Sequence, residues 1–250
     1  MESRQQVLAA NWKMYKTKEE ARAFARDFLP LLQENTAEII VCPPATLLAE
    51  LHDLFSGSRV KLGVQNIYWE KEGAYTGEIS AAMAADSGAA YCLTGHSERR
   101  QYFGENAAIV ARKTQAALEA GLTPIVCVGE TLQQRQNGQT LMVLHDDVRA
   151  SLAGITPQPR LIIAYEPVWA IGSGQVATPA DAEEAIAHIR SVVAEIWGAV
   201  AQKVRILYGG SVKPDNIGEM LAAANIDGAL VGGASLHAAA FAAIANGATG

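Results

Sequence analysis

The chain has 250 residues, of which half are hydrophobic and 18% are charged, a composition typical of a folded globular protein rather than a disordered one. A net charge of −6 disfavours nucleic acid as a partner, and no run of about 18 uncharged apolar residues predicts a membrane span. The first residues lack the apolar core of a secretion signal, and Cys42, Cys92 and Cys127 lie in apolar runs typical of buried free thiols. We therefore expect a protein of a reducing compartment, the cytoplasm.

Eight short apolar runs recur along the chain. They cover residues 7–10, 38–42, 60–64, 91–93, 124–128, 161–165, 204–207 and 228–231. Most of them are continuous rather than alternating, which is typical of parallel strands that are covered on both faces.

Helical patterns lie between these runs. Apolar residues recur at spacings of three and four over residues 182–196, and Thr178 and Pro179 are a typical helix start before them. Another predicted helix covers residues 105–120 and ends at Gly121, a typical left-handed cap.

Eight alternating strand and helix units without a linker predict one domain over residues 1–250. The fold class is α/β, and this number of units favours a closed (β/α)8 barrel of parallel strands ringed by helices. Periodicity alone leaves a doubly wound sheet of six to eight strands as an alternative.

Titratable side chains follow several predicted strands, at the end of a barrel where active sites form. Glu166 directly follows the apolar run 161–165, where burial is expected to raise its pKa and make it a stronger base. The alternative is an ion-paired carboxylate at a strand end. The uncharged segment 167–177, with two glycines near its middle, is typical of a lid that closes over a ligand.

Two further groups are candidates for a role beside this base. His96 precedes a short predicted helix, residues 97–100, whose N-terminus disfavours the imidazolium form. A neutral imidazole can still donate a hydrogen bond to a substrate carbonyl. Lys13 supplies a cation near the first strand, and Glu98 is its candidate partner. The alternatives are a structural histidine and solvated surface charges.

Glycine pairs follow the last two strands, at 209–210 and 232–233. Glycine allows a ligand to approach backbone N–H groups closely, and a helix expected to begin near Ser235 would add a favourable N-terminus. Barrels often hold phosphate between these two loops, so the pairs predict a phosphate site, with tight turns as the alternative.

Five segments in order, residues 11–14, 94–100, 164–172, 208–212 and 230–236, resemble the triosephosphate isomerase family. The resemblance spans nearly the whole chain. It implies that Glu166 is the base that moves a proton between two carbons, and that His96 is the neutral electrophile. It also implies that Lys13 stabilises negative charge, that Asn11 contributes an oxyanion hydrogen bond, and that Glu98 positions Lys13.

The same resemblance implies the substrates dihydroxyacetone phosphate and glyceraldehyde 3-phosphate, a place in glycolysis and gluconeogenesis, and no metal or organic cofactor. Backbone N–H groups of Gly172, Ser211, Gly232 and Gly233 would bind the phosphate, with Gly172 arriving when the lid closes. The loop 66–78, including Tyr75 and Thr76, resembles the family's dimer loop, so we expect a homodimer.

One segment departs from the family pattern. The end of the lid reads Gln175-Val176-Ala177, where the family commonly has a lysine followed by a small or hydroxyl residue, and β-branched Val176 is expected to stiffen this hinge. Two alternative functions are a phosphosugar lyase or aldolase, which often needs a Schiff-base lysine or a metal cluster, and a phosphate-binding scaffold without activity.

Overall fold

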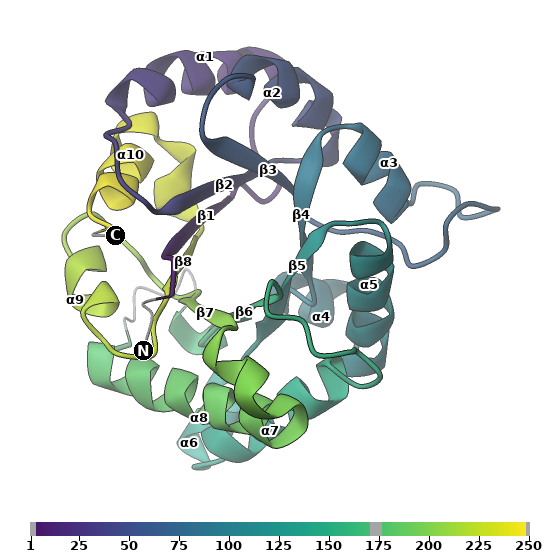
Figure 1. The fold of residues 1–250 in the computed structure, drawn as a ribbon, viewed down its shortest axis with the longest axis vertical. Coiled ribbons are helices and arrows are strands. Elements are labelled where there is room, and N and C mark those ends of the chain that lie inside the picture. The colour runs from purple at the N-terminus through teal and green to yellow at the C-terminus, as the bar shows by residue number, and fades with distance from the viewer. Residues whose placement is uncertain (1–3, 171–176, 249–250) are drawn as a thin grey trace.

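The computed structural model describes residues 4–170 and 177–248. In this part of the chain, parallel strands close into a barrel in sequence order, with β1 paired to both β2 and β8 (Figure 1). The closed ring confirms the predicted (β/α)8 barrel and rules out the doubly wound sheet. The strands are β1 (Val7–Asn11), β2 (Glu38–Cys42), β3 (Val60–Val64), β4 (Ala89–Thr94), β5 (Thr123–Val128), β6 (Ile162–Tyr165), β7 (Arg205–Tyr208) and β8 (Gly228–Val231).

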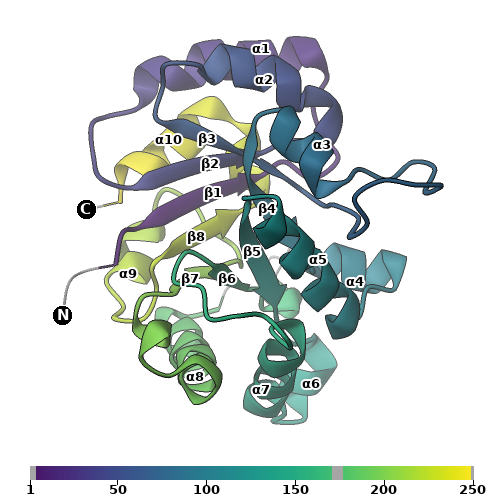
Figure 2. The same cartoon turned by 45° about the vertical axis from the view of Figure 1, so that its right-hand side comes forward.

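Helices surround the barrel on its outside (Figures 1 and 2). The α-helices are α1 (Lys18–Phe28), α2 (Leu48–Phe55), α3 (Ala81–Asp86), α4 (Ser97–Phe103), α5 (Ala107–Glu119), α6 (Leu132–Gln136), α7 (Thr140–Ser151), α8 (Pro179–Trp197), α9 (Ile217–Leu221) and α10 (Ala238–Asn246). Short 3-10 helices are η1 (Leu29–Leu31), η2 (Ala45–Leu47), η3 (Val168–Ala170), η4 (Gly198–Gln202) and η5 (Gly233–Leu236).

The helix boundaries follow from their caps. Thr178 and Asp181 form the capping box that starts α8, as the sequence predicts. The start of α5 lies two residues after the predicted one, because the Asn106 side chain accepts a hydrogen bond from Ile109 N and so caps the helix. Gly121, just after α5, has the predicted positive φ.

Strand residues alternate between two hydrophobic cores. In β1, Val7 and Ala9 belong to a cluster inside the barrel, whereas Leu8 and Ala10 belong to the larger cluster between the strands and the helices. Both sets are buried. Burial of both faces explains why the strands are continuous apolar runs in the sequence.

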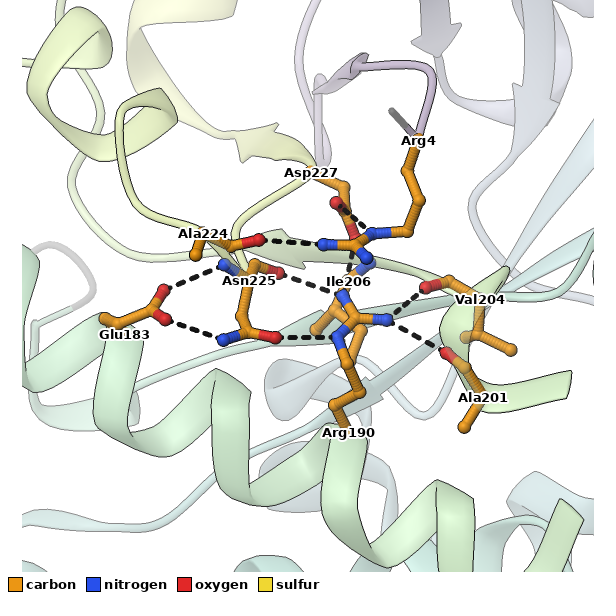
Figure 3. A network of polar contacts seen from close by, with 9 residues as sticks. All are labelled: Arg4, Glu183, Arg190, Ala201, Val204, Ile206, Ala224, Asn225 and Asp227. Atoms are coloured by element: carbon orange, nitrogen blue, oxygen red, sulfur yellow. Dashed lines mark hydrogen bonds and ion pairs between the residues drawn. The ribbon is translucent and has the colours of Figure 1, made fainter. Parts of the chain in front are cut away.

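A network of buried charges ties together the N-terminal ends of β7 and β8 (Figure 3). Asp227 accepts hydrogen bonds from Arg190 Nη2 at 2.8 Å, Arg4 Nε at 2.6 Å and Ile206 N at 2.8 Å. Arg190 also donates to the carbonyls of Ala201, Val204 and Asn225. This end of the barrel lies opposite the loops described below, so the network serves stability.

Candidate active site

A cavity of about 570 Å³ opens at the C-terminal ends of the strands. It brings together most of the predicted site residues. Its lining includes Asn11, Lys13, His96, Glu166, Ser211, Gly232 and Gly233. Glu98 lies behind the cavity as the partner of Lys13, and Gly172 lies outside the described residues.

The loop after β1 fixes Lys13 at the cavity. Lys13 has a positive φ of 53°, and the Asn11 side chain stabilises this turn by accepting a hydrogen bond from Lys13 N at 3.0 Å. Gln65 donates to the Lys13 carbonyl at 2.8 Å. Lys13 Nζ donates to Glu98 Oε1 at 2.6 Å. The lysine is therefore held in place at both its backbone and its ammonium group.

His96 and Glu166 are in direct contact. The imidazole Nε2 donates to Glu166 Oε1 at 2.8 Å, and the backbone amide of Ser97 donates to Glu166 Oε2 at 2.8 Å. His96 is also the N-cap of α4, where its Nδ1 accepts a hydrogen bond from Glu98 N at 3.2 Å. Because a backbone amide can only donate, this contact places the lone pair on Nδ1 and the proton on Nε2.

The ionisation of this pair differs from the sequence-based expectation. Burial raises the pKa of Glu166, but the charge and hydrogen bond of His96 and the Ser97 amide together outweigh it, so the net pKa is lowered. Burial lowers the pKa of His96, but Glu166 outweighs it, so the net pKa is raised. The predicted rise of the Glu166 pKa was wrong, because that prediction left out His96 as a neighbour. For His96, the carboxylate opposes the expected preference for the neutral form.

The three cysteines are free and buried, as predicted. Burial raises the pKa of the Cys42 thiol to about 12. Burial and the charge of the nearby Glu166 carboxylate also raise the pKa of Cys127. Cys127 therefore packs against the base from inside the barrel as a neutral group.

Close packing requires glycine in the first pair, whereas a Cβ on Gly233 would meet nothing within 4 Å. A Cβ on Gly210 would lie 2.2 Å from the Tyr208 hydroxyl oxygen, and one on Gly232 would lie 3.6 Å from Lys13 Cε. The Gly232 backbone therefore lies directly beside the lysine. The helix expected near Ser235 is instead the 3-10 helix η5, which begins at Gly233. The backbone amide and the hydroxyl of Ser235 both donate hydrogen bonds to the Gly232 carbonyl.

The first residues of the predicted lid are attached to the rim of the site. Trp169 Nε1 donates to the buried Glu130 Oε1 at 2.8 Å, and Ser211 Oγ donates to the Ala170 carbonyl at 2.8 Å. Residues 171–176 of the predicted lid, which include Gly172 and the hinge residues Gln175 and Val176, lie outside the described residues, whereas Ala177 is described and buried.

Sequence reasoning missed several groups at the site. The Ser97 amide holds the carboxylate of Glu166, and Gln65 holds the turn at Lys13. Gln65 directly follows β3 and Ser97 directly follows His96, so inspection of every loop after a strand could have found them. Lys213 and His237 also line the cavity.

Residues 4–170 and 177–248 contain no group of three or more histidine, cysteine, aspartate or glutamate side chains placed to hold a metal ion. Among the helices of these same ranges, none has the length and apolar character needed to cross a membrane.

Comparison with known proteins gives consistent matches over almost the full length. A family model described as triosephosphate isomerase matches residues 6–248. The triosephosphate isomerase of Moorella thermoacetica is 54% identical over 245 residues, which cover 97% of this chain and 98% of that protein. That of Chloroflexus aurantiacus is 54% identical over 239 residues, 94% of this chain and 96% of that protein. The crystal structure of triosephosphate isomerase from Bartonella henselae superposes with a TM-score of 0.89 at 42% identity, covering 97% of this chain and 98% of that one.

Proposed function

The chain belongs to the triosephosphate isomerase family, and we propose that it interconverts dihydroxyacetone phosphate and glyceraldehyde 3-phosphate by proton transfer on Glu166. The contact between Glu166 and His96, at the mouth of a cavity that also holds Lys13 and two glycine turns, is the observation that supports this mechanism best. A single three-carbon molecule in this cavity can reach both groups.

The substrate phosphate binds backbone N–H groups of Ser211, Gly232 and Gly233, which line one side of the cavity. The family resemblance adds Gly172 to this set. Lys13 stands beside Gly232, so its charge stabilises both the phosphate and the negative charge that develops during the reaction.

Proton transfer then uses Glu166 and His96, which contact each other in the absence of substrate. Substrate enters between them, so that His96 Nε2–H donates to the carbonyl oxygen in place of the Glu166 carboxylate. Glu166 takes a proton from the carbon beside the carbonyl and returns it to the neighbouring carbon. Between these two steps, His96 Nε2 gives its proton to the former carbonyl oxygen and takes the proton of the adjacent hydroxyl, so the enediolate can collapse to the new carbonyl and His96 ends neutral. Asn11 and Lys13 stabilise the enediolate oxygens. This sequence requires no metal or organic cofactor.

The test is direct assay of isomerisation with the Glu166→Gln variant. We expect kcat to fall by at least about 100-fold, the scale of general-base catalysis, while competitive binding of inorganic phosphate persists. Glu38→Gln is the matched control, because Glu38 is also a strand-end carboxylate but begins β2, at the opposite end of the barrel. A Glu166→Gln variant that keeps more than about a tenth of its turnover would show that the base is another group.

We also propose that the active form is a homodimer that uses the loop 66–78. Large apolar side chains are exposed after β1, β3 and β4, which is unusual for a monomer. They are Met14 (93% exposed), Tyr15 (57%), Tyr75 (41%), Met83 (56%), Tyr102 (69%) and Phe103 (67%). The loop itself extends away from the barrel between β3 and α3 (Figures 1 and 2). These features support docking of a second copy on this side, with Tyr75 and Thr76 in the contact.

We also propose that the protein is cytoplasmic and that residues 1–250 form a single domain. Free thiols are typical of a reducing compartment, and the buried core between strands and helices includes residues from β1 through β8.

A further inference from the structure

We propose that Arg100 and Asp147 are positioning residues that fix the distance between His96 and Glu166. The inference rests on the proposed roles of these two groups. Neither Arg100 nor Asp147 lines the cavity. Arg100 belongs to the segment 94–100 that carries the family resemblance, but the sequence assigned a role to neither residue. Their effect comes from the backbone segments that they hold together.

Arg100 holds the peptide that precedes the histidine. Its Nε, on α4, donates to the carbonyl of Gly95, the first residue after β4, at 2.8 Å. Gly95 has a φ of +70°, and a Cβ there would lie 2.6 Å from Val110 Cγ2. Val110 therefore excludes a side chain at Gly95, and the Arg100 hydrogen bond fixes the carbonyl of the peptide that precedes His96.

The same guanidinium reaches the neighbouring strand. Arg100 Nη2 donates to the Cys127 carbonyl at 2.9 Å, near the end of β5. The thiol of this cysteine lies near the Glu166 carboxylate, whose charge helps to raise the thiol pKa. One planar group thus links the backbone of the histidine loop to the residue that packs against the base.

Asp147 on α7 completes the link from the other side. Its Oδ1 lies 3.0 Å from Arg100 Nη1, and it accepts hydrogen bonds from Ser151 Oγ and from the Gly129 amide. Gly129 packs so closely behind the base that a Cβ there would lie 1.8 Å from the Glu166 carbonyl oxygen. Asp147 therefore aligns the arginine and the backbone behind Glu166 at the same time.

The geometry requires arginine rather than a generic cation. Nε, Nη1 and Nη2 each donate to a different segment, and Nη2 also reaches Ser151 Oγ at 3.3 Å. Lysine keeps the charge but lacks the planar fork that makes these bonds together. A small displacement of His96 relative to Glu166 slows proton transfer, since a misplacement of about 1 Å can cost about 100-fold in rate.

The experiment compares Arg100→Lys with Arg190→Lys, a matched buried arginine in the network at the opposite end of the barrel. We expect Arg100→Lys to lower kcat by about 10- to 100-fold, with KM and the inhibition constant of inorganic phosphate within about twofold of the parent values. We expect Arg190→Lys to lose stability while kcat per folded molecule stays at the parent value. Equal kcat values per folded molecule for the two variants would overturn the proposal.

Asp147→Asn gives a second test that does not depend on the folding of the arginine variant. We expect it to lower kcat in the same direction, and the double variant to be no slower than the slower single variant, because the two residues act as one unit. Independent, multiplicative losses would overturn the role of Asp147. The ring ¹⁵N shifts of His96 give a readout that a stability defect does not move, and unchanged shifts in Arg100→Lys would count against repositioning.

These outcomes distinguish a wrong assignment of the base from a wrong assignment of the positioning residues. If Glu166→Gln keeps its turnover, the proposed base is wrong. If Glu166→Gln is inactive and Arg100→Lys is as fast as Arg190→Lys, only the positioning role is wrong.

Discussion

Glu166 and His96 share a 2.8 Å hydrogen bond in which the imidazole is the donor, so the two groups proposed to act on substrate satisfy each other before it arrives. The Ser97 amide occupies the second oxygen of the carboxylate. Substrate binding must therefore exchange one hydrogen bond for another instead of desolvating two free groups, which keeps the cost of forming the reactive complex low.

This pair makes stability depend on pH in a defined window. The lowered pKa of Glu166 contributes stability above its ordinary value of 4.5, and this is lost as pH falls through the lowered value. The raised pKa of His96 contributes stability below its ordinary value of 6.5, and this is lost as pH rises through the raised value. Both contributions to stability are fully present between pH 4.5 and pH 6.5.

Urea unfolding of the parent chain and of His96→Gln checks this window. We expect the difference in unfolding free energy between them to be larger at about pH 5.5 than at about pH 9. A difference that grows toward high pH would contradict the direction assigned to His96.

Gly210 should not tolerate a side chain. In Gly210→Ala, the new Cβ would lie 2.2 Å from the Tyr208 hydroxyl oxygen and 2.4 Å from its Cζ, and Tyr208 is fully buried. We expect a loss of about 1–3 kcal/mol in unfolding free energy, together with a raised KM, because the displaced turn leads into Ser211. The control is Gly218→Ala, whose Cβ meets nothing within 4 Å and which should leave the protein at least as stable.

Asp227 should be essential for stability and irrelevant to the chemical step. Replacing it with asparagine leaves two arginines beside a neutral group in a site where Asp227 is only 4% exposed. We expect a loss of about 3 kcal/mol or more in unfolding free energy, and an unchanged kcat for the folded fraction. Arg22→Ala, which breaks a pair on the surface, should not change the unfolding transition measurably. A fall in kcat at full folding would show that this end of the barrel influences the site.

Disruption of the proposed dimer contact should make activity depend on concentration. Tyr75 packs against Tyr68, with ring centroids 4.6 Å apart, near the tip of the extended loop. We expect Tyr75→Arg to raise the dimer dissociation constant by about 30-fold, the effect of losing ~2 kcal/mol at an interface. Sedimentation velocity and specific activity over a dilution series measure this. Leu132→Arg, an exposed apolar position on α6, serves as the control and should sediment like the parent.

The strands were predictable because both of their faces are buried, and each predicted run lies within about two residues of the observed strand. The barrel rule, which puts active sites at the C-terminal ends of strands, then identified Lys13, His96 and Glu166 as neighbours in space. Sequence order and topology were sufficient for this step.

Side-chain geometry was not predictable in the same way. The lowered pKa of Glu166 depends on an imidazole nitrogen at 2.8 Å, and no pattern in the sequence gives that distance. Likewise, Arg100 and Asp147 lie on different helices, and their pairing depends on how α4 and α7 pack beside β5. Contacts of this kind come from tertiary packing, which local periodicity does not encode.

The burial of Cys42, Cys92 and Cys127 has a practical consequence for handling the protein. Thiols alkylate and oxidise through the thiolate, which burial makes scarce at neutral pH in all three cases. The folded chain should therefore resist iodoacetamide and mild peroxide without a reducing agent. An exposed cysteine introduced by mutation would react in preference to these three, so the unaltered chain can serve as the background for attaching a fluorophore at a chosen position.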